Sequence, residues 1–173
     1  MYYRYPIERI ATTPHTRFQT GFARMAMYLM PELSDVVYEA TILGLRILGS
    51  DESALVKPSN ILQQIYGNEI TLTKPRVRML RDAQGVKEPI MNVRISAPPS
   101  TEDGILVDLY RRSAVIQERD RQPAAVVVRA QAPLRAILGY HATLSALTEG
   151  RAELWTWLSH YERLPDPPDG GAA

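Results

Sequence analysis

The clearest alternation of apolar and polar side chains lies in the second half of the chain. Residues 90–95 alternate with a period of two, which is typical of a half-buried strand. Thr101, followed by Glu102 and Asp103, marks the start of a helix that runs through Arg112, because short polar and acidic side chains favour helix N-termini. A strand followed by a helix is therefore predicted here.

The remainder of the second half predicts a further helix and three strands. The helix spans residues 134–148, with apolar residues on one face and Gly150 just past its end. The strands are placed at residues 115–117, 124–130 and 151–160, with residues 118–123 as a polar turn between the first two.

The first half repeats the same order of elements. A strand is predicted at residues 6–12, a helix at 16–33, a strand or hairpin at 36–48, a helix from Asp51 to Tyr66, and a strand at 69–74. Each half therefore predicts a split β-α-β unit. The expected fold class is α+β, with two tandem ferredoxin-like domains.

A polar, glycine-containing stretch at residues 81–87 separates the two patterns. We therefore expect one domain at residues 1–80 and a second at residues 88–165. Residues 166–173 are rich in Pro and Gly and carry little that could be buried, so they are expected to form a flexible tail.

Composition narrows the possible chemistry. The 173 residues are 45% hydrophobic and 23% charged, which is typical of a folded globular chain. A net charge of +1 argues against a surface that is basic throughout, so any RNA contact must be a local patch. The absence of Cys excludes disulfides and thiolate chemistry, and with only three His no zinc site is expected. No metal or cofactor is expected.

No targeting or membrane segment is expected either. The first 13 residues contain no apolar run of signal-peptide length, and no stretch approaches the 18 apolar residues that a membrane span requires. The expected compartment is the cytoplasm.

Several short motifs in the second half share the order and spacing of one known domain. They are Glu88 to Val93, Gly104 to Asp108 followed by Arg111 and Arg112, Ala130 to Leu134, Gly139-Tyr140, Leu144 to Ala152, and Ser159 to Glu162. Together they resemble the signature of the fifth, C-terminal domain of elongation factor G, over residues 88–165. The first half is more weakly similar to the third domain of that family, chiefly at residues 65–67 and 69–78.

The resemblance covers only part of the family's pattern. The elongated fourth domain has no counterpart around Gly85, and the GTPase and the barrel that follows it are missing from the chain. The sequence contains no GxxxxGK[ST] loop, so we expect no nucleotide binding and no enzymatic activity. What the resemblance still implies is ribosome binding, since family members dock the fifth domain against ribosomal RNA and the stalk base.

Five arginines are candidates for contact with RNA phosphates: Arg111, Arg112, Arg119, Arg121 and Arg151. The alternative is structural, because an arginine at a helix C-terminus complements the helix dipole and residues 118 and 120 could neutralise their neighbours. His141 is assigned to the same RNA-facing group. An acid/base pair of His141 and His160 is disfavoured, since no carboxylate stands at a spacing that would orient either ring.

Trp155 and Trp157 fall on one face of the last strand. They cover either a domain or subunit interface or an exposed stacking surface, and the interface is the favoured interpretation. A third group, with Met25, Met27 and Met30 beside Phe18 and Phe22, is predicted to be core rather than an adaptable binding stripe.

The predicted function is a non-catalytic, ribosome-binding protein or translation modulator that contacts ribosomal RNA and stalk-base proteins. The alternative is a protein–protein interaction module that keeps the fold, with a homodimer formed through the Trp-bearing sheet or an open strand edge. A one-sided basic surface would favour the first function, and an exposed apolar face the second.

Overall fold

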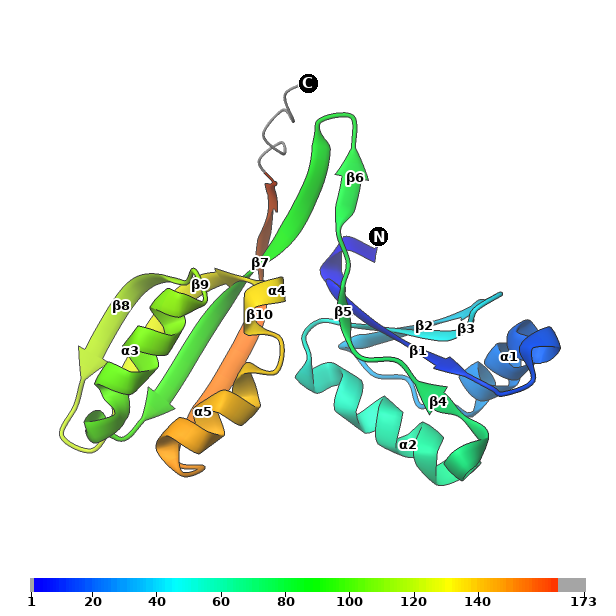
Figure 1. Cartoon of the computed structure of the whole chain (residues 1–173), viewed down its shortest axis with the longest axis horizontal. Helices are drawn as coiled ribbons and strands as arrows, with labels where there is room; N and C mark the ends of the chain where they lie inside the picture. Colours follow the sequence, from blue (N-terminus) through cyan, green and yellow to red (C-terminus); the bar gives the residue numbers. More distant parts are fainter. Residues whose placement is uncertain (1, 165–173) are drawn as a thin grey trace, which may run out of the picture.

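The computed structural model describes residues 2–164 as two units, each built from one sheet and its helices (Figure 1). The predicted tail at residues 166–173 lies outside these described residues. The two units lie side by side, and a long hairpin projects beyond both of them.

The first unit contains a sheet with the strand order β2-β3-β1-β4, and all neighbouring strands are antiparallel. Its elements are β1 (Ile7–Thr12), α1 (Gln19–Leu29), β2 (Val36–Thr41), β3 (Gly44–Gly49), α2 (Val56–Tyr66) and β4 (Thr71–Leu72), with β5 (Arg76–Val77) also pairing with β1. Short 3-10 turns precede α1 at Thr16–Phe18 and α2 at Ser53–Leu55.

The second unit contains a sheet with the equivalent order, β10-β7-β9-β8. Its elements are β7 (Gly85–Ala97), α3 (Glu102–Arg111), β8 (Val115–Arg121), β9 (Val126–Pro133), α4 (Leu134–Ile137), α5 (Tyr140–Thr148) and β10 (Glu153–Arg163), with β6 (Leu80–Asp82) pairing with β7. In both sheets the first strand lies between the last and the third, which is the arrangement of a split β-α-β fold. The predicted fold class, two tandem ferredoxin-like domains, is confirmed.

Two predicted element boundaries in the second unit were wrong. Residues 118–121 do not form a turn, because β8 continues to Arg121 and pairs with β9 as far as Val126. The predicted single helix at 134–148 is broken at Gly139, whose φ of 71° lies in the left-handed region, so that α4 and α5 are separate helices.

The polar stretch at residues 81–87 forms the tip of the projecting hairpin. β6 pairs with the start of β7, and Gly85 turns the chain at a φ of 119°. On the other side of β7, β10 pairs along almost its whole length, from Arg163 opposite Lys87 to Glu153 opposite Ser96. The extended β7 therefore belongs to both the hairpin and the second sheet.

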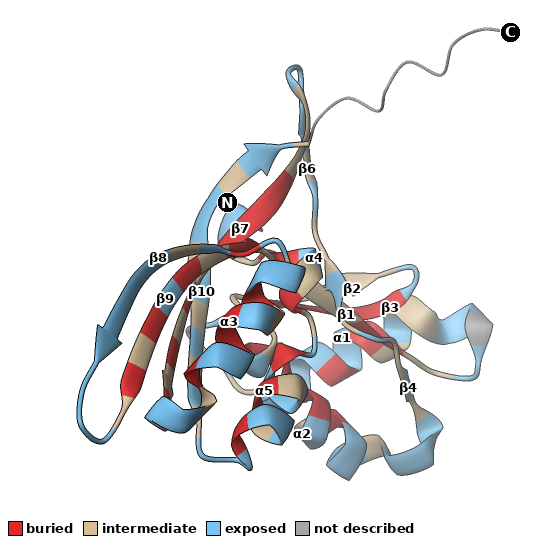
Figure 2. Cartoon of the chain, turned by 60° about the vertical axis from the view of Figure 1, so that its left-hand side comes forward, coloured by how far each residue is buried: buried red, intermediate tan, exposed pale blue. Residues whose placement is uncertain are grey.

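Each sheet buries one face against its helices (Figure 2). In the second unit, α3 and α5 lie on the same face of the sheet, and this face carries residues such as Val93, Ile95 and Val128, which are almost fully buried. Buried apolar residues of both units form one continuous cluster. Among the described residues, no helix is long and apolar enough to cross a membrane.

The predicted core role of the methionine and phenylalanine group in α1 was largely wrong. Met30 is buried and Phe22 is partly buried, but Phe18 is 69% exposed and Met25 is 65% exposed. The face of α1 that packs on the sheet is built from Ala23 and Ala26 instead, both fully buried. Small residues bring the helix close to the sheet, and its larger apolar side chains then lie outside.

Candidate functional site

The predicted arginines of the second unit fall into two groups at opposite ends of α3. Gly104 lies near Leu147, and Arg112 donates a hydrogen bond to Thr143, so α3 and α5 run antiparallel. Arg111, Arg112 and His141 therefore lie at one end of the helix pair. Arg119, Arg121 and Arg151 lie at the other, and the ten residues of α3 separate the groups by about 15 Å.

Arg112 is held inside the unit. Its guanidinium donates hydrogen bonds to Asp108 Oδ2 (2.7 Å), to the Ala136 carbonyl (2.9 Å) and to Thr143 Oγ1 (3.1 Å). It also lies 4.7 Å from the centre of the Tyr140 ring. All of these contacts join α3 to α4 and α5, so Arg112 has a structural role within the unit.

Arg111, its neighbour, is exposed. Among the described residues, no hydrogen bond or ion pair holds its side chain. His141 is also exposed, at the start of α5. The free cationic group at this end of the helix pair is therefore that of Arg111.

Arg119 and Arg121 share a buried carboxylate at the other end. Glu102 is only 4% exposed; its Oε2 accepts a hydrogen bond from Arg121 Nε at 2.5 Å, and Arg119 lies 3.6 Å from its Oε1. This pairing raises the pKa of Arg121, chiefly through the hydrogen bond to Glu102 and then through the carboxylate's charge. Glu102 therefore neutralises part of the positive charge of this pair.

Arg151 remains close to the surface beside these two. Its Nε donates a hydrogen bond to the Thr148 carbonyl at 3.2 Å, and its guanidinium lies 3.8 Å from Glu149. Both contacts are local, and the Arg151 side chain is still 54% exposed, so its charge is accessible to a partner.

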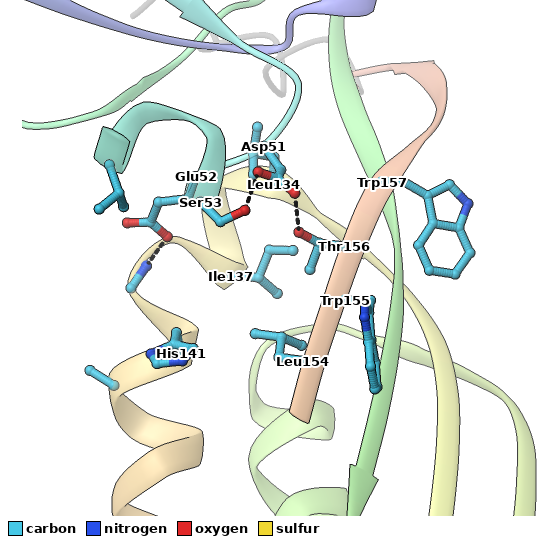
Figure 3. Close-up of a pocket in the computed structure, with 13 residues that line it drawn as sticks. Asp51, Glu52, Ser53, Leu134, Ile137, His141, Leu154, Trp155, Thr156 and Trp157 are labelled. Carbon is cyan, nitrogen blue, oxygen red and sulfur yellow. Dashed lines mark hydrogen bonds between the residues drawn. The ribbon is translucent and has the colours of Figure 1, made fainter. Parts of the chain in front are cut away.

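A pocket of about 560 Å³ lies between the two units (Figure 3). Its lining comprises Asp51, Glu52, Ser53 and Val56 from the first unit and Leu134, Ile137, Gly139, His141, Ala142 and residues 154–157 from the second. Leu154 and Thr156 point into the pocket, whereas Trp155 and Trp157 project to the other side of β10.

The two carboxylates of this pocket are used to join the units. Glu52 Oε2 accepts a hydrogen bond from the Gly139 amide at 2.8 Å, and Thr156 Oγ1 lies 3.5 Å from Asp51 Oδ2. Asp51 Oδ1 also accepts hydrogen bonds from Ser53 and the Ala54 amide. The sequence predicted only the start of a helix at Asp51. The hydrogen bond of Glu52 to Gly139, 87 residues away, could not be predicted from it.

The Trp pair occupies the outer face of the second sheet. Trp155 is 41% exposed and Trp157 is 48% exposed, and α3 and α5 pack on the opposite face. Arg94 lies on the neighbouring strand, with its guanidinium carbon 4.7 Å from the centre of the Trp155 ring. Sequence reasoning did not select Arg94, although the polar positions 92, 94 and 96 of the alternating strand could have indicated it.

His141 and His160 lie apart from any metal-holding group in the described part of the chain. Groups of three or more His, Asp or Glu side chains placed to hold a metal ion do not occur there. His160 Nδ1 contacts Ser159 Oγ at 3.0 Å, and His141 lies at the pocket wall. The surfaces described above present guanidinium, indole and amide groups.

The geometry defines the class of the protein as one with tandem ferredoxin-like domains. Comparison with known proteins then identifies the second domain: residues 85–169 match the family of the elongation factor G C-terminus. The resemblance indicated by the motifs is therefore confirmed: residues 85–169 are similar to the elongation factor G C-terminus.

Curated relatives agree with this assignment. Elongation factor G of Granulibacter bethesdensis is 34% identical over 90 residues, which are 52% of this chain and 13% of the relative. The same protein of Gluconobacter oxydans is 36% identical over 80 residues, and that of Fervidobacterium nodosum is 39% identical over 79 residues; each match covers 46% of this chain and 11% of the relative. The match thus spans 11 to 13% of the length of these relatives.

Proposed function

We propose that this chain binds the ribosome in the cytoplasm and modulates translation without hydrolysing GTP. The observation that carries the proposal is the match of residues 85–169 to the elongation factor G C-terminus, on a domain whose surface is suited to binding rather than catalysis. The chain contains no phosphate-binding GxxxxGK[ST] loop. By the same resemblance, residues 1–80 act as a third-domain-like support for residues 88–165.

The proposed contacts with ribosomal RNA come from the two ends of the α3 and α5 pair. Arg111 and His141 supply one end, and Arg119, Arg121 and Arg151 supply the other. Arginine side chains that contact phosphates release counterions, so binding weakens as salt is raised. Arg112 is not included among the proposed RNA contacts, because its guanidinium donates hydrogen bonds to Ala136 and Thr143 inside the unit. Stalk-base proteins are the proposed protein partners.

Sedimentation of the chain with purified ribosomes across a salt series tests this proposal. Arg111→Ala should weaken binding several-fold and reduce the slope of log K against log salt by about one. Lys57→Ala is the matched control, since Lys57 is an exposed cation on the first unit. Background sedimentation at the lowest salt, or an equal effect of both variants, would contradict the proposal.

A second candidate function is a protein–protein interaction module. It is favoured by the exposed apolar surface around α1, where Tyr28 is 88% exposed beside Phe18, Met25 and Leu29. Apolar residues gathered on one surface mark interaction sites. If this surface forms a homodimer, sedimentation equilibrium should detect a dimer that Tyr28→Glu dissociates. If the chain is monomeric at the highest concentration measured, the homodimer interpretation is wrong.

A further inference from the structure

The outer face of the second sheet presents two neighbouring rows of side chains. Residues directly opposite one another on antiparallel strands share a face. One row runs from Trp157 through Asn92 and Gln131 to Val115. The next runs from Trp155 through Arg94 and Arg129 to Glu118. Aromatic, amide and guanidinium groups therefore lie side by side on a face that carries no helix.

The amide groups of the first row form an ordered network. Gln131 Nε2 donates hydrogen bonds to Asn92 Oδ1 at 2.9 Å and to Ser159 Oγ at 3.0 Å. The network fixes the side chains beside Trp157. It leaves Gln131 Oε1 as an acceptor and Asn92 Nδ2 as a donor for a ligand. Such groups match the hydrogen-bonding edges of nucleobases.

The second row holds one indole in place. The Arg94 guanidinium stacks near the Trp155 ring at 4.7 Å, and Arg129 pairs with Glu118 at 2.7 Å. A guanidinium plane beside an indole is itself a stacking surface for a flat, unpaired base. Trp155 and Arg94 are therefore arranged as a stacking element before any ligand binds.

The charge on this face is balanced. The positive charges of Arg94 and Arg129 are balanced by the negative charges of Glu118 and Glu153. Asp120 adds a further negative charge on β8, at the edge of the sheet. The row of Trp157 carries no charge. Attraction to phosphates is therefore weak here, and binding must depend on stacking. A protein partner is the less suitable occupant, because interface cores are depleted of charged residues and here the two indoles are surrounded by polar groups.

We propose that this face, through Trp155, Trp157, Arg94 and Gln131, binds unpaired nucleobases of single-stranded RNA by stacking. The inference deepens the proposed ribosome binding and rests on it for the source of the RNA. Single-stranded RNA is recognised in this way on other four-stranded sheets, where exposed aromatic residues stack the bases. Paired bases cannot bind, since their π-faces are covered within the duplex.

Tryptophan fluorescence tests the proposal directly, because both tryptophans of the chain lie on this face. The full chain is titrated with a single-stranded oligouridylate and an oligoadenylate, each of about 12 nucleotides, and with an RNA duplex of equal length. Both single strands should quench the fluorescence and bind at least tenfold more tightly than the duplex. Their salt dependence should be shallow, with a slope magnitude of about one or less.

Variants are compared by the anisotropy of a labelled oligonucleotide. Trp157→Leu and Trp155→Leu should each weaken single-strand binding about tenfold, and Trp155→Phe by less, because a phenyl ring still stacks. Tyr110→Leu is the matched control: Tyr110 is a 65% exposed aromatic residue on α3, which packs on the opposite face. An equal loss in Tyr110→Leu, or equal binding of duplex and single strand, would overturn the proposal.

Ribosome sedimentation of the Trp157→Leu variant separates this inference from the proposed function. If the variant loses ribosome binding while no oligonucleotide quenches the wild type, the face contacts a ribosomal protein; the stacking inference then fails and the proposed function stands. If oligonucleotides bind and the wild type does not sediment with ribosomes, the stacking site stands and the proposed function fails.

Discussion

At the scale of single residues, two neighbouring arginines have different roles. Arg112 donates to Asp108, Ala136 and Thr143 and so holds the C-terminal end of α3 against the following helices. Arg111 is exposed and has no such contacts. A one-residue step around a helix turns a side chain by about 100°, which is sufficient to separate a structural arginine from a surface one.

Arg112→Ala should lower the free energy of unfolding by about 2 to 3 kcal/mol, because hydrogen bonds to a charged group are lost and Asp108 loses its partner. Arg111→Ala should change it by less than about 0.5 kcal/mol, as expected of a surface substitution. Urea denaturation of both variants provides the measurement. Equal effects would contradict the assignment of roles.

Two tyrosines with buried hydroxyls, the partly buried Tyr38 and the buried Tyr140, should make the fold sensitive to high pH. Burial, and to a lesser extent the charge of Asp35, raises the pKa of Tyr38 from 10.0 to about 12. Burial, followed by the charge of Asp108, also raises the pKa of Tyr140. The folded state thus retains these protons when the unfolded chain has lost them, so the free energy of unfolding is unaffected below pH 10 and falls as the pH rises toward 12.

Tyr38→Phe should remove part of this alkaline loss of stability. At pH 7 the substitution should cost less than about 1 kcal/mol, because the buried Tyr38 hydroxyl has no hydrogen-bond partner. Urea denaturation at pH values from 7 to about 11 would measure both effects. Tyr28→Phe is the control, since Tyr28 is 88% exposed. An unchanged pH profile in Tyr38→Phe would contradict the buried-phenol explanation.

Some residue roles could be predicted from the sequence and others could not. The period-two alternation placed Trp155 and Trp157 together on one face of a strand, and the structure agrees. The partners of Arg112 could not be predicted, since Ala136 and Thr143 are brought to it only by the packing of α4 and α5. Local patterns carry information about faces, whereas long-range partners depend on the tertiary arrangement.

At the scale of elements, the C-terminal end of α3 is strained. Ser113 follows the helix with a φ of 59°, a left-handed conformation that a residue with a Cβ adopts at a cost. Ser113→Gly should therefore raise the free energy of unfolding by about 0.5 to 1 kcal/mol. Ser113→Ala is the control and should not stabilise the protein. Thermal melting of both variants provides the measurement. Destabilisation by Ser113→Gly would contradict the interpretation that Ser113 is strained.

The order of elements was largely predictable, but their ends were less so. Polar residues 118–121 suggested a turn, yet β8 lies at the sheet edge, where both faces of a strand can be polar. In α1, more apolar residues are present than one helix face can bury, so hydrophobicity alone did not identify the contact face. Ala23 and Ala26 occupy it, because close helix–sheet packing selects small side chains there.

At the scale of the whole molecule, the two units should unfold together. Their buried residues form one continuous cluster, and Glu52 and Gly139 join the units through a 2.8 Å hydrogen bond. Tryptophan fluorescence reports on the second unit alone, whereas far-UV circular dichroism reports on both. The two signals should give coincident urea transitions. Separate transitions in the wild type would contradict a shared core. In the Glu52→Ala variant, which lacks the hydrogen bond to Gly139, the two transitions should begin to separate.

Competition for ribosomes tests the proposal that the second unit binds the ribosome at the site of elongation factor G, whose C-terminus it resembles. The labelled chain is sedimented with ribosomes while unlabelled bacterial elongation factor G, held on the ribosome with a non-hydrolysable GTP analogue, is added in increasing amounts. Progressive release of the chain is predicted, with loss of half the bound chain near the factor's own dissociation constant. A chain that stays bound when the factor saturates the ribosomes, or never binds at all, would contradict it.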